Sequence, residues 1–504
     1  MQRLSHMKKN PIPFFLLTAF LFGACTPPNK PVETEALPKE TLDQVKQSLR
    51  NGVIPTPGAV KDNNVPSTSD ACEKFIARLP KDWFREKLEV PENPAEPAGR
   101  KIKIFYYGKI FPQSTPTIFF NGGPGADSHS SYFNLASMKE TFDSKNKISF
   151  VFIDQRGNGC SDFFPQGKTE EIINRLSHYG SKGIVSDSEY VRKKLLNDKK
   201  WNAFGQSYGG HIVHRYLIQA PQGLKAGFSH ANIVQSSGYE RTKNRIASQA
   251  RVLQNYFSQF PEDRAKLDAL KTYLSLERCY VNPYIKDEKA CGHEVLESLN
   301  SLLGFSDSWI SLHQWVGIMV KNETIVDEEI GRYLATFYFD EDNSNPLNIK
   351  NWASQVIAWV DRNVEGTSGY NCQKIRNDLQ KEGIDLNAAT IHECMSALQY
   401  YTDPIDKPQD DSPTGKLIKG LPRELMTLGQ LQDALVEHPE TMLYLYSGQR
   451  DTFVPVENFL EELARVKDFQ NVSYTHFNGT GHEGFNSEPK VWADLIKQSA
   501  PDAK

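Results

Sequence analysis

"WNAFGQSYGGHIV", residues 201–213, is the stretch that decides the fold. Its first residues read as a short apolar strand, and its last residues read as the start of an amphipathic helix. Between them Gly205, Ser207 and Gly209 form G-x-S-x-G, the only such pentapeptide in the chain. A serine in this context occupies a tight, crowded strand-to-helix turn that needs glycines two residues before and after it. The turn presents the hydroxyl at the carboxyl edge of a sheet, so we predict that Ser207 is a nucleophile.

Strand-like runs alternate with helical runs on both sides of this turn. The expected strands are 102–107, 117–120, 148–153, 201–204, 231–234, 442–446 and 472–477. Between 240 and 425 strand signals are sparse and helical patterns dominate. Short apolar strands alternating with helices predict an α/β fold with a mostly parallel sheet covered on both faces. The sequence therefore predicts one α/β core interrupted by a large, mainly helical cap insertion.

Composition limits the possible partners. The chain has 504 residues, 39% of them hydrophobic, which is enough for a large core and an inserted segment. Its net charge of −4 gives no support for nucleic-acid binding. None of the cysteines has metal-ligand spacing, so we expect neither a metal nor a cofactor. The oligomeric state stays open.

The first residues have the pattern of an export signal. Arg3, Lys8 and Lys9 precede an apolar run at 11–22 that is too short to span a bilayer as a helix. The small residues that follow lead to Cys25, and the segment resembles a bacterial lipoprotein signal in which this cysteine is lipidated. We therefore expect a signal peptide at 1–24, a Pro- and Thr-rich tether at 25–70, and an exported lipoprotein of the cell envelope that is anchored to a membrane through its lipid. The alternative is an ordinary signal peptide.

The cysteine count favours disulfides. If Cys25 carries lipid, six cysteines remain, an even number in an oxidising compartment. Local pairing is the simplest prediction, although six cysteines permit fifteen connectivities. The expected pairs are Cys279–Cys291, Cys372–Cys394 and Cys72–Cys160.

A serine nucleophile needs a base and an orienting acid, and in this kind of fold they follow in the order Ser, Asp, His. "YSGQRDTFVP" offers Asp451 just after the first expected strand beyond the insertion. "FNGTGHEGF" offers His482 just after the second. Because parallel strands place ligands at their carboxyl ends, we predict that both side chains act with Ser207.

The oxyanion of a tetrahedral intermediate needs two amide donors. One is the amide of the residue after the nucleophile, here Tyr208, and the second comes from a loop after an earlier strand. "NGGPG" at 121–125 is such a loop, since its glycines let the main chain approach closely. We predict that the Gly123 amide is the second donor.

Together these motifs resemble the proline iminopeptidase family of α/β-hydrolases and its tripeptidyl aminopeptidase relatives. The similar strings are "NGGPG", "DQRGNGCSD", "GQSYGG", "GQRDTFVP" and "GTGHEG". The resemblance covers roughly 101–239 and 441–504 and does not extend to the insertion. With the helical pattern between them, we expect an α/β-hydrolase core at 71–239 and 426–504 around a helical cap at 240–425. The resemblance also implies Ser207 as nucleophile, His482 as base and Asp451 as orienting acid. We expect Asp154 and Arg156 to lock the D-Q-R-G turn, with Gly157 at the turn itself.

The resemblance implies a serine aminopeptidase that releases N-terminal residues, with proline as one candidate, or short peptides. Two departures argue against a strict proline preference: the nucleophile string is "GQSYG" rather than G-G-S-W-G, and the insertion has no W-x-x-W-E. Candidate ligands for the peptide's free amine are Glu240 and Glu483. A carboxylesterase with the same three residues is the alternative, and a non-catalytic binding module is a third hypothesis.

Overall fold

The computed structural model describes residues 68–504 with gaps at 124, 126, 129–138, 166–168, 233, 235–238, 275–278, 282–288, 306–307, 338–356, 358–359, 362–371, 385–415, 418–419, 483–488 and 500–504. The expected signal peptide and most of the tether therefore lie outside the described residues, as do Cys25, Cys394 and Glu483. Core and insertion belong to one compact unit, Asn63–Lys504.

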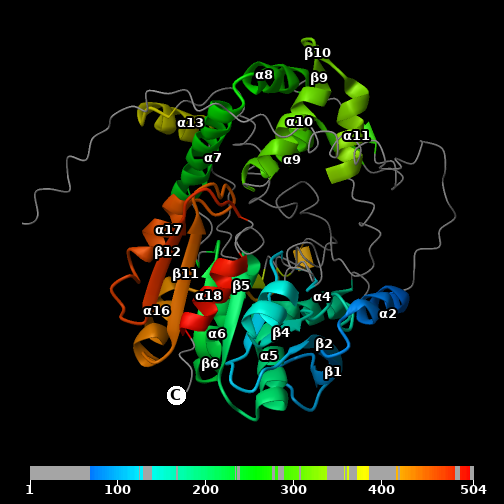
Figure 1. The fold of residues 1–504 in the computed structure, drawn as a ribbon, viewed down its shortest axis with the longest axis vertical. Helices are drawn as coiled ribbons and strands as arrows, with labels where there is room; N and C mark the ends of the chain where they lie inside the picture. Colours follow the sequence, from blue (N-terminus) through cyan, green and yellow to red (C-terminus); the bar gives the residue numbers. More distant parts are fainter. Residues whose placement is uncertain are drawn as a thin grey trace, which may run out of the picture. The chain divides into compact units, whose positions relative to one another are not determined.

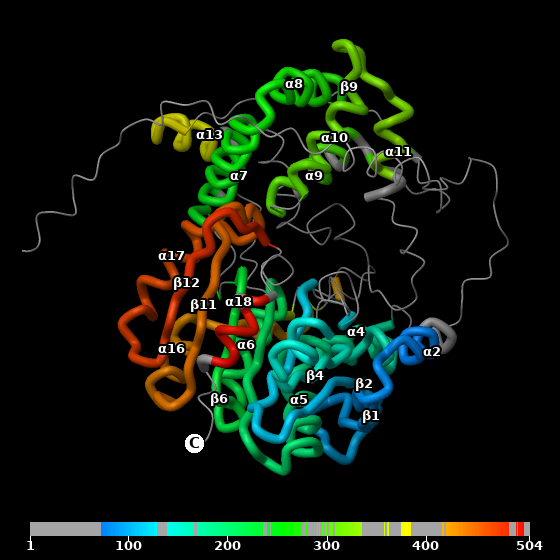
Figure 2. Tube along the Cα trace, in the orientation of Figure 1, coloured from blue at the N-terminus to red at the C-terminus, as the bar shows by residue number. Residues whose placement is uncertain are grey.

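An eight-stranded sheet forms the core of the α/β part (Figure 1), with the strand order β1-β2-β4-β3-β5-β6-β11-β12. The strands are β1 Phe84–Pro91, β2 Lys101–Lys109, β3 Thr117–Phe120, β4 Phe150–Ile153, β5 Trp201–Gln206, β6 Leu224–His230, β11 Met442–Gly448 and β12 Val472–Phe477. β2 pairs antiparallel with both β1 and β4, and the remaining strands of this sheet, β4, β3, β5, β6, β11 and β12, run parallel to one another. β11 pairs directly with β6, so the chain returns after the insertion to extend the same sheet (Figure 2).

The alternation of side chains along the strands gives the sheet two different faces. In β2, Ile104 and Tyr106 belong to one buried cluster, whereas Phe105 and Tyr107 belong to the other. β4 repeats the pattern, with Val151 on the first face. Strands buried on both faces need continuous apolar runs, as these two have. Each fully buried large apolar side chain contributes roughly 1.5–3 kcal/mol to folding.

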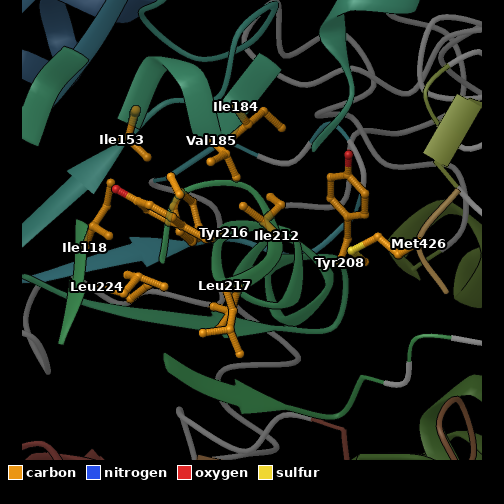
Figure 3. Close-up of a cluster of buried hydrophobic side chains, with 14 of the residues drawn as sticks. Ile118, Ile153, Ile184, Val185, Tyr208, Ile212, Tyr216, Leu217, Leu224 and Met426 are labelled. Carbon is orange, nitrogen blue, oxygen red and sulfur yellow. The ribbon is translucent and has the colours of Figure 1, made fainter. Parts of the chain in front are cut away.

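The first face of the sheet is mainly aliphatic and is covered by α5 Ser181–Leu196, α6 Tyr208–Gln219 and α16 Leu428–Glu437. α4 Glu170–Leu176 also contributes to it. Figure 3 shows Ile212, Tyr216 and Leu217 of α6 projecting into this cluster. Tyr208, at the start of α6, stands at the end of the cluster beside Met426.

The second face is mainly aromatic. It is covered by α2 Thr68–Arg78, the π-helix Lys139–Asn146 and α18 Pro489–Ser499. Trp492 of α18 packs edge-on against Phe204, with ring centroids 5.1 Å apart. A disulfide joins Cys72 of α2 to Cys160, which confirms that predicted pair and ties α2 to the loop after β4.

The segment between β6 and α16 is mainly helical in its described residues, as expected. Its described elements are α7 Tyr239–Gln259, α8 Asp263–Leu274, β7 Cys279–Val281, β8 Lys289–Cys291, α9 Gly292–Leu303, α10 Trp309–Met319, β9 Val320–Lys321, β10 Thr324–Ile325, α11 Asp327–Phe337 and α13 Cys372–Lys381. Helices α7 to α11 share their own hydrophobic cluster. We call the segment 240–425 the cap.

Cysteines also occur in the cap. Cys279 is disulfide-bonded, and Cys291 lies directly opposite it in the antiparallel β7–β8 ladder. Cys372 begins α13, but its expected partner lies outside the described residues. Within the described part of the chain, no helix is both long enough and apolar enough to cross a membrane.

One expected strand is wrong. The described residues of the strand predicted at 231–234 are not in a strand, because β6 ends at His230. Ala231 has a φ of 51°, a left-handed conformation that ends an extended run, and its amide donates to the Tyr446 carbonyl oxygen at 3.0 Å. The true strand reads "LKAGFSH", where lysine and glycine interrupt the apolar pattern.

Candidate active site

Ser207 lies between the end of β5 and the start of α6, as the sequence predicts. Its backbone has φ 56° and ψ −122°, a conformation that costs about 1–3 kcal/mol for a residue other than glycine. Two hydrogen bonds hold it: its amide donates to the His230 carbonyl oxygen at 2.9 Å, and its own carbonyl accepts from the His211 amide at 3.2 Å. The serine side chain is therefore turned out of both the strand and the helix.

The glycines on either side of Ser207 are required by close approach of the backbone. A Cβ on Gly205 would lie 2.0 Å from the Gly209 carbonyl oxygen. A Cβ on Gly209 would lie 2.1 Å from the carbonyl oxygen of Phe120, the last residue of β3. The G-x-S-x-G pattern thus packs the turn against the strand that leads into the NGGPG loop.

His482 and Asp451 are hydrogen-bonded to each other, with 2.9 Å between His482 Nδ1 and Asp451 Oδ2. Asp451 is fully buried, and its other oxygen accepts from the amides of Phe453 and Val454, both at 2.8 Å. The pair follows β11 and β12, which continue the sheet from β5 and β6. All three predicted residues thus come directly after parallel strands, at the edge where such strands gather their ligands.

The loop that carries His482 is held from two sides. From the core, the Gln206 side chain donates to the His482 carbonyl oxygen. From the cap, the carbonyl oxygen of Gly304 accepts from the His482 amide at 2.8 Å. The His482 ring packs beside the rings of Phe453 and Phe305, at centroid distances of 4.9 and 6.1 Å, and those two rings are 5.5 Å apart. The cap therefore forms one wall beside the histidine.

The NGGPG loop lies against Ser207. A Cβ added to Gly122 would be 3.3 Å from Ser207 Cβ and 3.8 Å from Ser207 Oγ. The Gly122 amide donates to the side-chain oxygen of Asn121 at 2.8 Å. The next residue, Gly123, is exposed and has a φ of 98°, a conformation suited to glycine. The buried Asn121 side chain therefore holds the loop together, since it also donates to the Asp127 carbonyl oxygen.

The expected lock between Asp154 and Arg156 is wrong. Arg156 instead forms a buried, two-pronged ion pair with Asp187 of α5, at 2.8 and 2.7 Å. Asp154 accepts from the amides of Ser128 and Cys160, at 2.9 and 2.7 Å. Asp154 therefore fastens the loops at 128 and 160, whereas Arg156 fastens the turn to α5; both residues lie beyond β4, which ends at Ile153.

Of the two candidates for the amine site, only Glu240 lies among the described residues. Glu240 lies in the first turn of α7, is exposed, and pairs with Lys243 at 2.9 Å. Lys243 also pairs with Glu382, at 3.0 Å. Glu483 lies outside the described residues.

Sequence reasoning missed Asp361, a residue of the cap. It is 1% exposed, and its Oδ2 accepts from the Tyr208 hydroxyl at 2.5 Å. Burial raises the pKa of the Asp361 carboxyl above its usual value, although hydrogen bonds from Tyr208 and Ser181 oppose the shift. No local motif marks this residue, because its partners lie more than 150 positions away in the sequence.

Two buried histidines close to the site predict acid sensitivity. Burial lowers the pKa of His214 in α6 to about 4 and that of His230 in β6 to about 3, against 6.5 for an exposed imidazole. Both are neutral in the folded protein, whereas the same side chains in the unfolded chain take up protons below pH 6.5. The unfolding free energy is therefore unaffected by these two histidines above pH 6.5 and decreases as the pH falls towards 4 and 3. Each should cost about 1.4 kcal/mol of unfolding free energy per pH unit in that range.

Between pH 7 and pH 5 we therefore expect the unfolding free energy to fall by about 2 kcal/mol for each histidine. Urea unfolding at several pH values measures this slope. In a His214→Asn variant, whose amide oxygen can still accept from Asn232, the slope should be shallower than in wild type. Equal slopes would contradict the assignment to His214.

Comparison with known proteins agrees with the fold. Residues 115–270 match the family described as the alpha/beta hydrolase fold. Over 167 residues the chain is 26% identical to a proline iminopeptidase of Aeromonas sobria, covering 31% of this chain and 38% of the relative. A crystal structure of a proline iminopeptidase from Mycobacterium smegmatis aligns with 82% of this chain and 97% of its own, at 13% identity and a TM-score of 0.38. The chain thus matches little more than a third of the length of the Aeromonas relative.

Proposed function

Because this chain is an α/β-hydrolase similar to the proline iminopeptidases, we propose that it is a serine aminopeptidase acting on short peptides with a free N-terminus. The observation that carries the proposal is the strained turn at Ser207 on the same edge of the sheet as the hydrogen-bonded His482–Asp451 pair. A non-catalytic binding module would have no physical need to keep all three residues.

In the proposed reaction, Ser207 Oγ attacks the carbonyl carbon of the scissile peptide bond while His482 Nε2 takes the hydroxyl proton. Asp451, bonded to Nδ1, holds the ring in the required tautomer and stabilises the imidazolium. The imidazolium then gives its proton to the leaving amine, which departs as the shortened peptide. Water, activated by the same histidine, hydrolyses the acyl-enzyme and restores Ser207.

The oxyanion of each tetrahedral intermediate needs donors fixed in advance. We assign them to the amides of Tyr208 and Gly123. The first opens α6, whose N-terminus also favours negative charge. The Gly123 assignment rests on the position of the NGGPG loop against Ser207, where a Cβ on Gly122 would lie 3.8 Å from Ser207 Oγ.

Recognition of a protonated amine distinguishes the aminopeptidase from the esterase. In a site shielded by a cap, that charge is costly to bury without a carboxylate partner. N-acetylating a good hexapeptide substrate should therefore lower kcat/KM by at least about 100-fold. Amidating the distant C-terminus of the same peptide is the control and should change kcat/KM by less than about threefold. Equal cleavage of free and acetylated peptides, or cleavage of esters alone, would favour the carboxylesterase.

Glu240 can be tested within the same experiment. Glu240 and Glu382 both pair with Lys243, so Glu382→Gln is a matched control for Glu240→Gln. If Glu240 binds the amine, only its variant should lose the preference for the free peptide. If both variants behave like wild type, Glu240 is excluded and the amine ligand lies elsewhere.

A further inference from the structure

A short piece of the cap sequence is built into the hydrolase core. Ile357 and Val360 belong to the aliphatic cluster on the first face of the sheet. The Val360 carbonyl oxygen accepts from the Glu424 amide at 2.8 Å. Asp361 follows directly, so its backbone position is set by apolar packing and by a main-chain hydrogen bond.

The Asp361 carboxylate binds at the junction of two core helices. Its Oδ2 accepts from the Ser181 amide at 2.6 Å, and its Oδ1 accepts from the Ser181 hydroxyl at 3.1 Å. The Ser181 hydroxyl oxygen also accepts from Arg215 Nε of α6, at 3.2 Å. A Cβ on Gly180 would come within 2.7 Å of Asp361 Oδ1, so the site is closely fitted to the carboxylate.

The remaining ligand of this carboxylate is the hydroxyl of Tyr208, the residue that follows Ser207. Tyr208 is 3% exposed, and its ring stacks on His211 with centroids 5.6 Å apart. Its hydroxyl points away from Ile212 and Leu217, out of the aliphatic cluster (Figure 3). The side chain of the proposed oxyanion donor is thus fixed by its ring to α6 and by its hydroxyl to the cap.

We propose that Asp361 is a positioning residue for the oxyanion hole, which it holds in register with Ser207 through the hydroxyl of Tyr208. The inference rests on the proposed function, because it takes the Tyr208 amide as an oxyanion donor. A donor must lie within hydrogen-bond reach of the oxyanion position before the reaction begins. A small rotation of the first turn of α6 would move the Tyr208 amide out of that reach and slow the reaction. The cap thereby contributes to the catalytic step as well as to substrate selection.

Asp361 does not suit the alternative role of amine ligand. Both oxygens already accept hydrogen bonds from Tyr208 and Ser181, and the side chain is buried. A peptide ammonium would have to reach a side chain that is 1% exposed and enclosed by Gly180, Ser181 and Tyr208. Positioning requires no access from the substrate site.

The test compares two tyrosines that make the same kind of bond. Tyr208→Phe removes the hydroxyl that binds Asp361, and Tyr256→Phe removes one that binds buried Asp263 of the cap at 2.6 Å. The readouts are kcat, KM, the rate constant for inactivation by a fluorophosphonate, and the melting temperature. Rates are expressed per folded, titratable site.

In Tyr208→Phe we expect kcat and the inactivation rate constant to fall at least about tenfold, with KM within about twofold of wild type. Tyr256→Phe should lose similar stability but keep both rates. Asp361→Asn should retain most of kcat, since its carbonyl can still accept from Tyr208 and Ser181, whereas Asp361→Leu should lose it. The double variant Tyr208→Phe/Asp361→Asn, which leaves no unpaired carboxylate, should remain as slow as Tyr208→Phe.

The inference is overturned if Tyr208→Phe, or the double variant where the single one does not fold, keeps kcat within about twofold of wild type. It is also overturned if Tyr256→Phe slows turnover equally. Neither result contradicts the proposed function. That function would be contradicted by a different observation, the inactivation of a Ser207→Ala variant by the same fluorophosphonate.

Discussion

Replacing Ser207 with alanine should lower kcat by roughly four to six orders of magnitude, for peptides and esters alike. The variant loses the only atom that can carry the acyl group in the proposed mechanism. Alanine leaves the backbone of the turn and the amides of Tyr208 and Gly123 in place. Residual turnover should therefore come only from substrate binding and the oxyanion donors. Steady-state kinetics with active-site titration measures the loss.

A buried serine elsewhere provides the control. Ser188 lies in α5, and its hydroxyl donates to the Ile184 carbonyl oxygen at 2.8 Å. Ser188→Ala should keep the wild-type kcat. If Ser207→Ala retained more than about a hundredth of wild-type kcat, Ser207 could not be the nucleophile.

Asp451→Asn should lower kcat by about four orders of magnitude while leaving the protein folded. The asparagine oxygen can still accept from the amides of Phe453 and Val454, so the loop keeps its shape. Its NH₂ group would then face His482 Nδ1, which favours the tautomer whose Nε2 carries a proton and cannot accept one from Ser207. The developing imidazolium would also lose its charged partner.

Kinetics and thermal melting together test this second result. Asp494→Asn is the control, because Asp494 is an exposed acid paired with Lys490 at 2.7 Å. It should change kcat by less than about twofold. If Asp451→Asn had the melting temperature of wild type and a similar kcat, another acid would have to orient the histidine.

The fold was largely predictable because its key signals are local. The apolar strand, the serine between two glycines and the amphipathic helix all lie within 201–213, and the structure has β5, the turn and α6 there. The strands that precede Asp451 and His482 were equally visible. β1 was not predicted, since "FREKLEVP" has three consecutive charged residues at 85–87 and only its last two residues are buried.

Long-range partners were harder to predict. Arg156 pairs with Asp187, 31 residues away, rather than with the neighbouring acid that sequence proximity suggested. Asp361 reaches Tyr208 across 153 residues. The identity of an aspartate carries no information about which distant helix will bury it. By contrast, Cys72–Cys160 was predictable from the even number of cysteines once the local pairs were assigned.

The most direct test of the central claim is to locate the covalent adduct that a fluorophosphonate leaves on the wild-type protein. Intact-mass analysis should show one phosphonyl group per chain, and peptide mapping should place it on Ser207. Labelling should be absent in Ser207→Ala and greatly slowed in Asp451→Asn, because the hydroxyl must be activated to react. An adduct on any other serine, or undiminished labelling of Ser207→Ala, would contradict the account.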